Sequence, residues 1–246
     1  MIKLAFFDFS RTIAKGSGLN TGAAQMGREK EFHKAFDDFV SHKLNDEDFI
    51  ETAMKLWRGF KEKDLPKIYP QIELRPNVQE VLKKLKEMQI KLALVTHMPI
   101  NLAEIYRKLG FDYLFGTECE IKEGIFTGRV LKINPDKGFI VRDLSNELRI
   151  RLNECIAVGD SKADVPMFES VGYKNSFAID ANDEVKEYAN LKRVISRIHA
   201  FLRELYRDHT GASNRLANYA AGHASRPTKS NYHKFKAHTI ADMRFP

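Results

Sequence analysis

The chain has 246 residues, 43% hydrophobic and 30% charged, a composition that supports one large domain or a domain with an insertion and argues against global disorder. No apolar run approaches the ~20 residues of a membrane span, and two cysteines are too few for a disulfide framework or a zinc site. The net charge of +7 is concentrated in residues 207–246, which hold seven Lys/Arg and two Asp, so the main body is nearly neutral and the basic balance of the chain says little about its partner.

Short apolar segments alternate with amphipathic segments along most of the chain. Strands are predicted at Leu4–Phe7, Leu92–Val95, Tyr113–Phe115, Cys155–Val158 and Ser176–Ile179. Helices are predicted at Pro76–Met88, Ile100–Leu109, Gly138–Leu152 and Ala163–Val171. Apolar strands separated by helices are typical of a parallel sheet covered on both faces. The pattern therefore predicts an α/β fold with a Rossmann-like, doubly wound parallel sheet.

Residues 18–75 interrupt this alternation. They contain no strand candidate and carry aromatic residues at helical spacings, and Asn45 precedes an acidic stretch typical of a helix start. We interpret the segment as a helical cap inserted into a core formed by residues 1–17 and 76–206. Two extra helices of the core are the alternative interpretation.

Two further segments lie outside the alternation. Residues 121–133 are predicted to form a β-hairpin with Gly124 and Gly128 at turns. Residues 207–246 lack sustained periodicity and are interpreted as a basic, flexible tail. A solvated tail is favoured over one that binds an anionic partner such as nucleic acid.

Acidic residues follow two of the predicted strands. Asp8 ends the first strand, Asp160 ends the strand at Cys155–Val158, and Asp164 follows four residues later. The carboxyl ends of parallel strands meet at one edge of a sheet, where ligands bind. Converging carboxylates repel one another unless a cation joins them, and a set of oxygen ligands favours Mg²⁺. The alternative is that each acid only caps a following helix.

Two more polar residues are expected at the same edge. Thr96 ends the predicted strand "KLALVT", and Lys137 precedes a predicted helix and offers a positive charge to an anion. Either residue alone is equally explained as a helix cap or a solvated lysine.

The order of these residues resembles the haloacid dehalogenase superfamily of phosphatases and phosphotransferases. Its first motif, D-x-D-x-T, reads Asp8-Phe9-Ser10-Arg11-Thr12 here, and its second, third and fourth motifs match Thr96, Lys137 and "GDSKAD" at 159–164. Segments such as "VGDSKADVPMFESVGY" are most similar to the phosphoserine-phosphatase-like branch, which places a helical cap between the first two motifs. The resemblance covers residues 1 to about 200.

The resemblance implies a role for each matching residue. Asp8 would attack phosphorus and form an aspartyl-phosphate. Mg²⁺ would be held by Asp8, by the main-chain carbonyl of Ser10 and by Asp160, while Asp164 would bind through water or orient a ligand.

Phosphoryl oxygens would be held by Thr96, Lys137 and the main-chain N–H groups around Phe9 to Arg11, according to the same resemblance. His97 and Met98 stand where that branch commonly has glycines. We expect this bulky pair to crowd the phosphate pocket; the alternative is that His97 supplies a donor.

Ser10 departs from the motif, because the family's second Asp protonates the leaving oxygen and then activates water. A serine hydroxyl cannot do this at neutral pH, and general acid–base help is worth ~10²–10⁴ in rate. The protein is then a slow phosphatase, a phosphatase for substrates with good leaving groups, or a phosphate-binding relative without turnover. The sequence does not exclude an engineered substitution at Ser10.

The substrate residues of the phosphoserine phosphatases are also missing. Their cap Glu aligns near Ser17 and their cap Arg aligns with Ala53, so the clamp for a zwitterionic serine group is absent. This argues against phosphoserine as the substrate.

The sequence thus predicts a Mg²⁺-dependent phosphatase that hydrolyses a small phosphorylated metabolite. A non-catalytic phosphate- or metabolite-binding relative is the alternative. Because the N-terminus lacks a signal-peptide layout, we expect a cytoplasmic protein with neither a membrane nor a nucleic-acid partner. The oligomeric state is left open.

Overall fold

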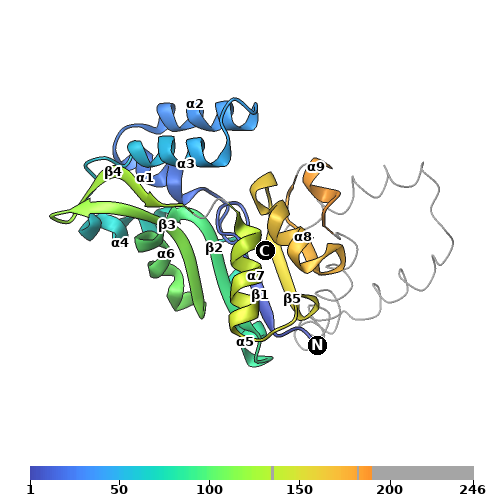
Figure 1. The fold of residues 1–246 in the computed structure, drawn as a ribbon. Coiled ribbons are helices and arrows are strands. Elements are labelled where there is room, and N and C mark those ends of the chain that lie inside the picture. Colours follow the sequence, from blue (N-terminus) through green and yellow to red (C-terminus); the bar gives the residue numbers. More distant parts are fainter. Residues whose placement is uncertain (134–135, 182, 190–246) are drawn as a thin grey trace, which may run out of the picture. The chain divides into compact units, whose positions relative to one another are not determined.

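The computed structural model describes residues 1–133, 136–181 and 183–189 (Figure 1). These residues belong to one compact unit. The predicted tail at 207–246 and the predicted core residues 190–206 lie outside the described residues. In the described part, no helix is both long and apolar enough to cross a membrane.

A six-stranded sheet forms the centre of the fold. Its strands are β1 (Leu4–Phe7), β2 (Lys91–Pro99), β3 (Tyr113–Lys122), β4 (Ile125–Lys132), β5 (Cys155–Gly159) and β6 (Ser176–Ala178). They lie in the order β4-β3-β2-β1-β5-β6, and every pair is parallel except the β3–β4 hairpin. The predicted α/β fold with a mostly parallel sheet is confirmed.

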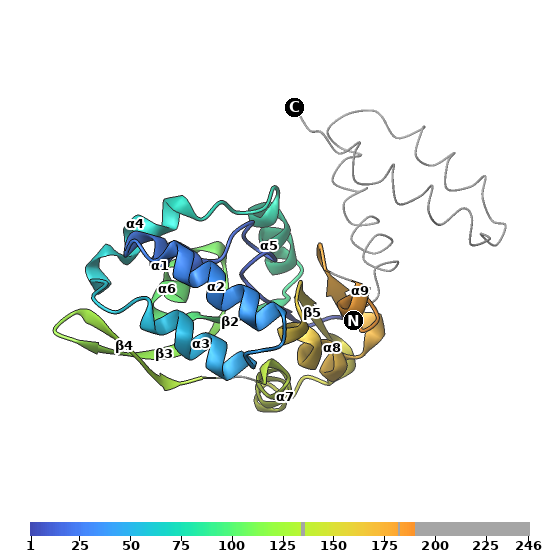
Figure 2. The same ribbon diagram turned by 90° about the horizontal axis from the view of Figure 1, so that it is seen from above.

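Helices cover both faces of this sheet, and the central strand β1 buries side chains on both sides. Leu4 and Phe6 of β1 pack in the hydrophobic cluster of α7 (Lys137–Glu147) and α8 (Val165–Val171). Ala5 and Phe7 face the opposite cluster, which contains α5 (Val78–Glu87) and α6 (Ile100–Ile105). Figure 2 shows α7 and α5 on opposite sides of the strands.

The strand order reverses next to β1. From β1 the chain builds outward through β2, β3 and β4, and then returns to add β5 on the other side of β1. This topological switch point is where open α/β sheets bind ligands, beyond the carboxyl ends of the strands. The residues that follow β1 and β5 are therefore brought together.

Residues 18–75, all described, contain helices and no strand. The helices are α1 (Gly18–Gln25), α2 (Glu29–Val40), α3 (Asp46–Lys55) and α4 (Leu65–Ile68), with short 3-10 turns at Glu62–Asp64 and Tyr69–Gln71. They share one hydrophobic cluster with the α5–α6 face of the sheet. The boundaries of a cap at 18 and 75 stay a prediction.

The packing of this helical segment depends on Trp57, which is fully buried. Its indole Nε1 donates to the carbonyl of Leu19 over 3.0 Å. A Cβ on Gly22 would lie only 2.0 Å from the indole ring. The absence of a side chain at Gly22 therefore lets α1 approach Trp57.

Several elements end at residues other than those predicted. Strand β2 continues past Thr96 to Pro99, with an irregular register after Val95. Gly124 lies in the β3–β4 turn, but Gly128 lies inside β4 with a positive φ of 81°, not at a turn. There a Cβ would lie 3.3 Å from the Cα of Lys55, so β4 passes α3 closely.

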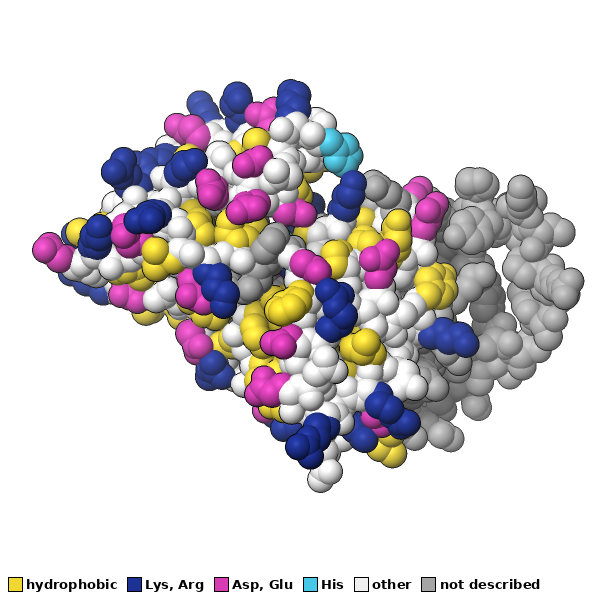
Figure 3. Space-filling view, viewed as in Figure 1, with side chains coloured by type: hydrophobic (Ala, Val, Ile, Leu, Met, Phe, Trp, Pro, Cys, Tyr) yellow, Lys and Arg dark blue, Asp and Glu magenta, His cyan; other side chains and the backbone are white. Residues whose placement is uncertain are grey.

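The remaining elements are short. They are 3-10 turns at Tyr106–Leu109, Leu152–Glu154, Lys162–Asp164 and Tyr173–Asn175, and α9 at Asp183–Lys186. Figure 3 shows basic and acidic side chains interspersed on the face of the molecule that is seen in Figure 1, in keeping with the nearly neutral main body.

Candidate active site

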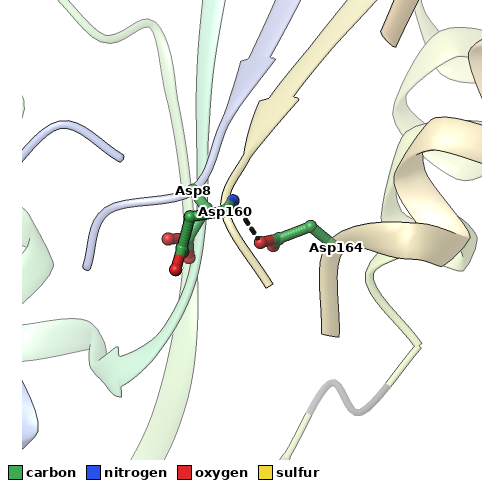
Figure 4. A group of neighbouring side chains, drawn as sticks. All are labelled: Asp8, Asp160 and Asp164. Atoms are coloured by element: carbon green, nitrogen blue, oxygen red, sulfur yellow. Dashed lines mark hydrogen bonds between the residues drawn. The ribbon is translucent and has the colours of Figure 1, made fainter. Parts of the chain in front are cut away.

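Three buried carboxylates converge at the switch point. Asp8 follows β1, Asp160 follows the adjacent strand β5, and Asp164 ends the 3-10 turn Lys162–Asp164 (Figure 4). One oxygen from each lies within 4.8 Å of the others. The predicted meeting of these acids, although Asp8 lies 152 residues before Asp160 in the chain, is thus present in the fold.

Asp164 is oriented by donors on both of its oxygens. Its Oδ2 accepts the main-chain N–H groups of Asp160 and Ser161 at 2.9 and 3.0 Å and the Ser161 hydroxyl at 3.0 Å. Its Oδ1 accepts Lys137 Nζ at 2.7 Å. A Cβ on Gly159 would lie 2.5 Å from the Asp164 side chain, so the glycine leaves the space this carboxylate occupies.

Lys137 links two of the acids. Its Nζ lies 2.7 Å from Asp8 Oδ1 and 2.7 Å from Asp164 Oδ1, and its side chain is only 2% exposed. Burial alone would lower the pKa of Lys137, but the carboxylates of Asp164 and Asp8 raise it. For Asp164, burial would raise the pKa, but Lys137 and the N–H donors lower it. Both groups are therefore charged.

The negative charges of Asp8 and Asp160 are less fully compensated than that of Asp164. Burial raises the pKa of Asp8 to about 6, with Lys137 opposing and Asp164 adding to the rise. Burial, together with the charges of Asp8 and Asp164, raises the pKa of Asp160 to about 7. Ionised forms of both carboxyls consequently need a further positive charge nearby.

The loop after β1 reaches Asp160 with two side chains. Arg11 Nε lies 2.9 Å from Asp160 Oδ2, and the Thr12 hydroxyl donates to Asp160 Oδ1 over 3.4 Å. Arg11 was predicted to contribute only its main chain. The ion pair of its side chain with Asp160 is a feature that the motif spacing did not reveal.

Thr96 and His97, the other residues predicted to bind phosphate, lie on β2, the strand that pairs with β1, and each contacts a group other than the three acids. The Thr96 hydroxyl is buried and accepts the N–H of Met98 at 3.3 Å. The carbonyl of His97 accepts the Thr117 hydroxyl at 2.7 Å. Their roles toward phosphate stay predictions.

The first loop is fixed by its own contacts. Phe9 is fully buried with its ring 4.4 Å from that of Tyr106, and its N–H donates to the Asp8 carboxyl. Ser10 is partly buried. The N–H of Arg11 donates to the Gly16 carbonyl at 3.3 Å, so this N–H already has an acceptor within the loop.

Sequence reasoning also missed Asp46, which it interpreted only as an acid in the first turn of a helix. Burial raises the pKa of Asp46. The positive charges of Lys137 and Lys162 oppose this rise, and the negative charge of Asp164 adds to it. Charges of the site therefore influence one acid at the start of α3. No local pattern signals this, because it depends on how residues 18–75 pack.

The comparisons with known proteins agree with this geometry. The profile of the haloacid dehalogenase-like hydrolase family matches residues 5–169. The chain belongs to this family. It is 30% identical over 194 residues to a phosphoserine phosphatase of Methanocaldococcus jannaschii, covering 77% of this chain and 90% of that protein.

Solved structures show the same relationship. A phospho-aspartyl intermediate analogue of phosphoserine phosphatase has a TM-score of 0.69 at 28% identity, covering 79% of this chain and 98% of that one. A substrate-bound phosphoserine phosphatase also has a TM-score of 0.69 at 27% identity, covering 80% and 98%. These findings confirm the predicted family, its phosphoserine-phosphatase-like branch and the enzyme class, a phosphoric monoester hydrolase.

Proposed function

We propose that the chain is a Mg²⁺-dependent phosphatase that hydrolyses a small phosphate monoester through a phosphorylated Asp8. The observation that carries this proposal is the convergence of Asp8, Asp160 and Asp164 at the switch point. With all three acids ionised, three compensating positive charges are needed, and Lys137 and Arg11 supply only two in the described contacts.

The residues at the site fit a divalent ion. All three acids offer oxygens, the ligands that Mg²⁺ prefers, and the raised pKa values of Asp8 and Asp160 indicate that their ionised forms are under-compensated. Asp8, the Ser10 carbonyl and Asp160 would hold the ion. Asp164 would orient the site, because donors already occupy both its oxygens. The ion would neutralise charge on the phosphoryl group.

The chain's own residues then define the reaction. The Asp8 carboxylate attacks phosphorus, the bond to the leaving oxygen breaks, and an aspartyl-phosphate forms. Water attacks this phosphorus in a second step, the bond between phosphorus and the Asp8 oxygen breaks, and inorganic phosphate leaves with the Asp8 carboxylate regenerated. Lys137, charged and 2.7 Å from Asp8, keeps that carboxylate ionised and would neutralise charge on a bound phosphoryl oxygen.

Ser10 limits this chemistry. No carboxyl stands at this position to protonate the leaving oxygen or to activate water, and acid–base help of this kind is worth ~10²–10⁴ in rate. We infer slow turnover of alkyl phosphates and faster turnover of esters whose leaving group departs without a proton.

The substrate that we propose is a small phosphorylated metabolite other than phosphoserine. At the two positions where the phosphoserine phosphatases carry charges, Ser17 caps α1 by accepting the N–H of Asn20, and Ala53 is fully buried. Neither residue carries a charge that would pair with a carboxylate or an ammonium group. A cytoplasmic location stays a prediction.

The test compares the chain with Ser10→Asp, Asp8→Asn and the matched control Ser10→Asn, which has the shape of Asp without its acid. Turnover of p-nitrophenyl phosphate and of an alkyl phosphate is measured with Mg²⁺. Mass spectrometry of acid-quenched protein detects covalently bound phosphate. We expect Ser10→Asp alone to raise alkyl phosphate turnover, by about 10²-fold or more, and Asp8→Asn to lose both turnover and the phosphoprotein.

The absence of an acid at Ser10 also favours a second candidate, a phosphate-binding relative without turnover. In that case no variant, including Ser10→Asp, would hydrolyse either ester or accumulate phosphoprotein. This outcome would overturn the proposed phosphatase.

A further inference from the structure

Arg11 places a positive charge on the acid that is proposed to hold the metal ion. Its Nε lies 2.9 Å from Asp160 Oδ2, while Asp160 is 7% exposed in its side chain. The Thr12 hydroxyl donates to the other oxygen, Asp160 Oδ1, over 3.4 Å. Both oxygens of Asp160 are thus bound by groups from the loop after β1.

The backbone of Arg11 is held in a specific conformation. Its φ is +59°, a left-handed value that is uncommon for a residue with a side chain. Its carbonyl accepts two N–H groups of Arg75, Nε at 3.0 Å and Nη2 at 2.5 Å. Arg75 is itself paired with Asp180 at 2.6 Å. The loop therefore directs Arg11 from a fixed backbone.

The guanidinium of Arg11 also contacts the helical segment. Its central carbon lies 5.4 Å from the ring centroid of Phe36 in α2, within the range of a cation–π interaction. Phe36 belongs to an aromatic group with Phe39 and Phe49, whose rings lie 6.4 and 6.0 Å from its own. One side chain thus joins Asp160 to α2.

We infer that Arg11 is an internal competitor for the divalent ion: it neutralises Asp160 and ties α2 to the sheet when the ion is absent, and it leaves Asp160 when the ion binds. The inference rests on the proposed metal site. A guanidinium on Asp160 blocks one ligand oxygen and repels a divalent cation even where solvent screens charges. The arginine fork suits a carboxylate better than a lysine ammonium does.

The test measures Mg²⁺ and Mn²⁺ binding to the full chain by calorimetry, which needs no turnover. Arg11→Gln removes the charge, Arg11→Lys keeps a point charge, and Arg142→Gln serves as the matched control on the surface of α7. We expect Arg11→Gln to bind either ion about tenfold tighter or more, Arg11→Lys to fall between it and the unaltered chain, and the control to be unchanged.

A second measurement tests the link to α2. Hydrogen exchange of the α2 amides is expected to rise when Mn²⁺ is added to the unaltered chain, because Arg11 releases Asp160. In Arg11→Gln the same amides are expected to exchange equally fast with and without the ion. Phe36→Leu, which keeps an apolar side chain, is expected to raise ion affinity less than Arg11→Gln does.

Equal or weaker ion binding by Arg11→Gln would overturn the inference, as would a failure of both proteins to bind either ion. A chain that binds the ion as expected but hydrolyses no ester would refute the proposed phosphatase and leave the role of Arg11 standing. The two failures are therefore distinguishable.

Discussion

Replacing Lys137 by Met tests the electrostatic account of the site most directly. The ammonium is buried and lies 2.7 Å from both Asp8 and Asp164. At an effective dielectric constant of about 20, each pair attracts by roughly 6 kcal/mol, and the cost of burying the charges offsets much of this. Removing one partner of a buried pair typically costs about 3–5 kcal/mol, because the other charge stays buried and uncompensated.

We therefore expect Lys137→Met to lower the free energy of unfolding of the metal-free chain by about 3–5 kcal/mol. Urea unfolding at pH 7.5 followed by circular dichroism measures this loss. Met keeps a similar length and apolar stem, so packing changes little. The control is Lys174→Met at an exposed position, where surface substitutions stay within about 0.5 kcal/mol.

The pH dependence separates electrostatics from packing. Without Lys137, the pKa of Asp8, already raised to about 6, rises further, and the pKa of Asp164 rises from its lowered value, so the folded chain binds more protons and loses more stability as pH rises. The penalty should therefore be smaller at pH 5 than at pH 7.5. A loss of the same size at both pH values would show that packing, not charge, explains the effect.

Two further predictions concern the metal and the helical packing. Burial raises the pKa of Asp8 to about 6 and that of Asp160 to about 7, and the ion needs both carboxyls ionised. Mg²⁺ binding at pH 6 should therefore release protons, and ion affinity should fall as the pH drops below 7. Calorimetry in buffers of different ionisation enthalpy measures the proton release, and zero release would contradict the prediction. Gly22→Ala should lower the free energy of unfolding by about 1–3 kcal/mol, because its Cβ would lie 2.0 Å from Trp57. Thermal unfolding measures this loss against Gly16→Ala, where the added Cβ meets nothing within 4 Å, and equal effects at both glycines would refute the packing argument.

The sheet and its acids could be predicted because both depend on local patterns. The strand at Leu4–Phe7 has the predicted bounds, and the apolar run at Cys155–Val158 ends one residue later at Gly159. Parallel strands must end at a common edge, so Asp8 and Asp160 had to meet once the two strands became neighbours. The end of β2 was predicted too early, because its last residues, from Val95 to Pro99, pair irregularly with β3. This pairing depends on β3 and not on the sequence of β2.

Contacts between distant side chains could not be predicted. The Arg11–Asp160 pair requires a left-handed backbone at Arg11 and a carbonyl held by Arg75, and neither has a sequence signal at the motif. The charge of Lys137 opposes the rise that burial causes in the pKa of Asp46, although 91 residues separate the two in the chain, because the fold brings them near each other. A helix start with acids looks the same whether or not it faces a site.

Ser10 and Arg11 are neighbours, and their effects on the site are complementary. Ser10 removes a negative charge and the proton relay that the family motif supplies, whereas Arg11 adds a positive charge on Asp160. Ser10 leaves the main-chain carbonyl in place, so it alters the proton relay and not the proposed ion ligand, whereas Arg11 would weaken ion binding through the proposed competition for Asp160. For the phosphatase that we propose, we therefore expect slow turnover of phosphate esters whose leaving oxygen needs a proton, because of Ser10, and weaker ion binding, because of Arg11.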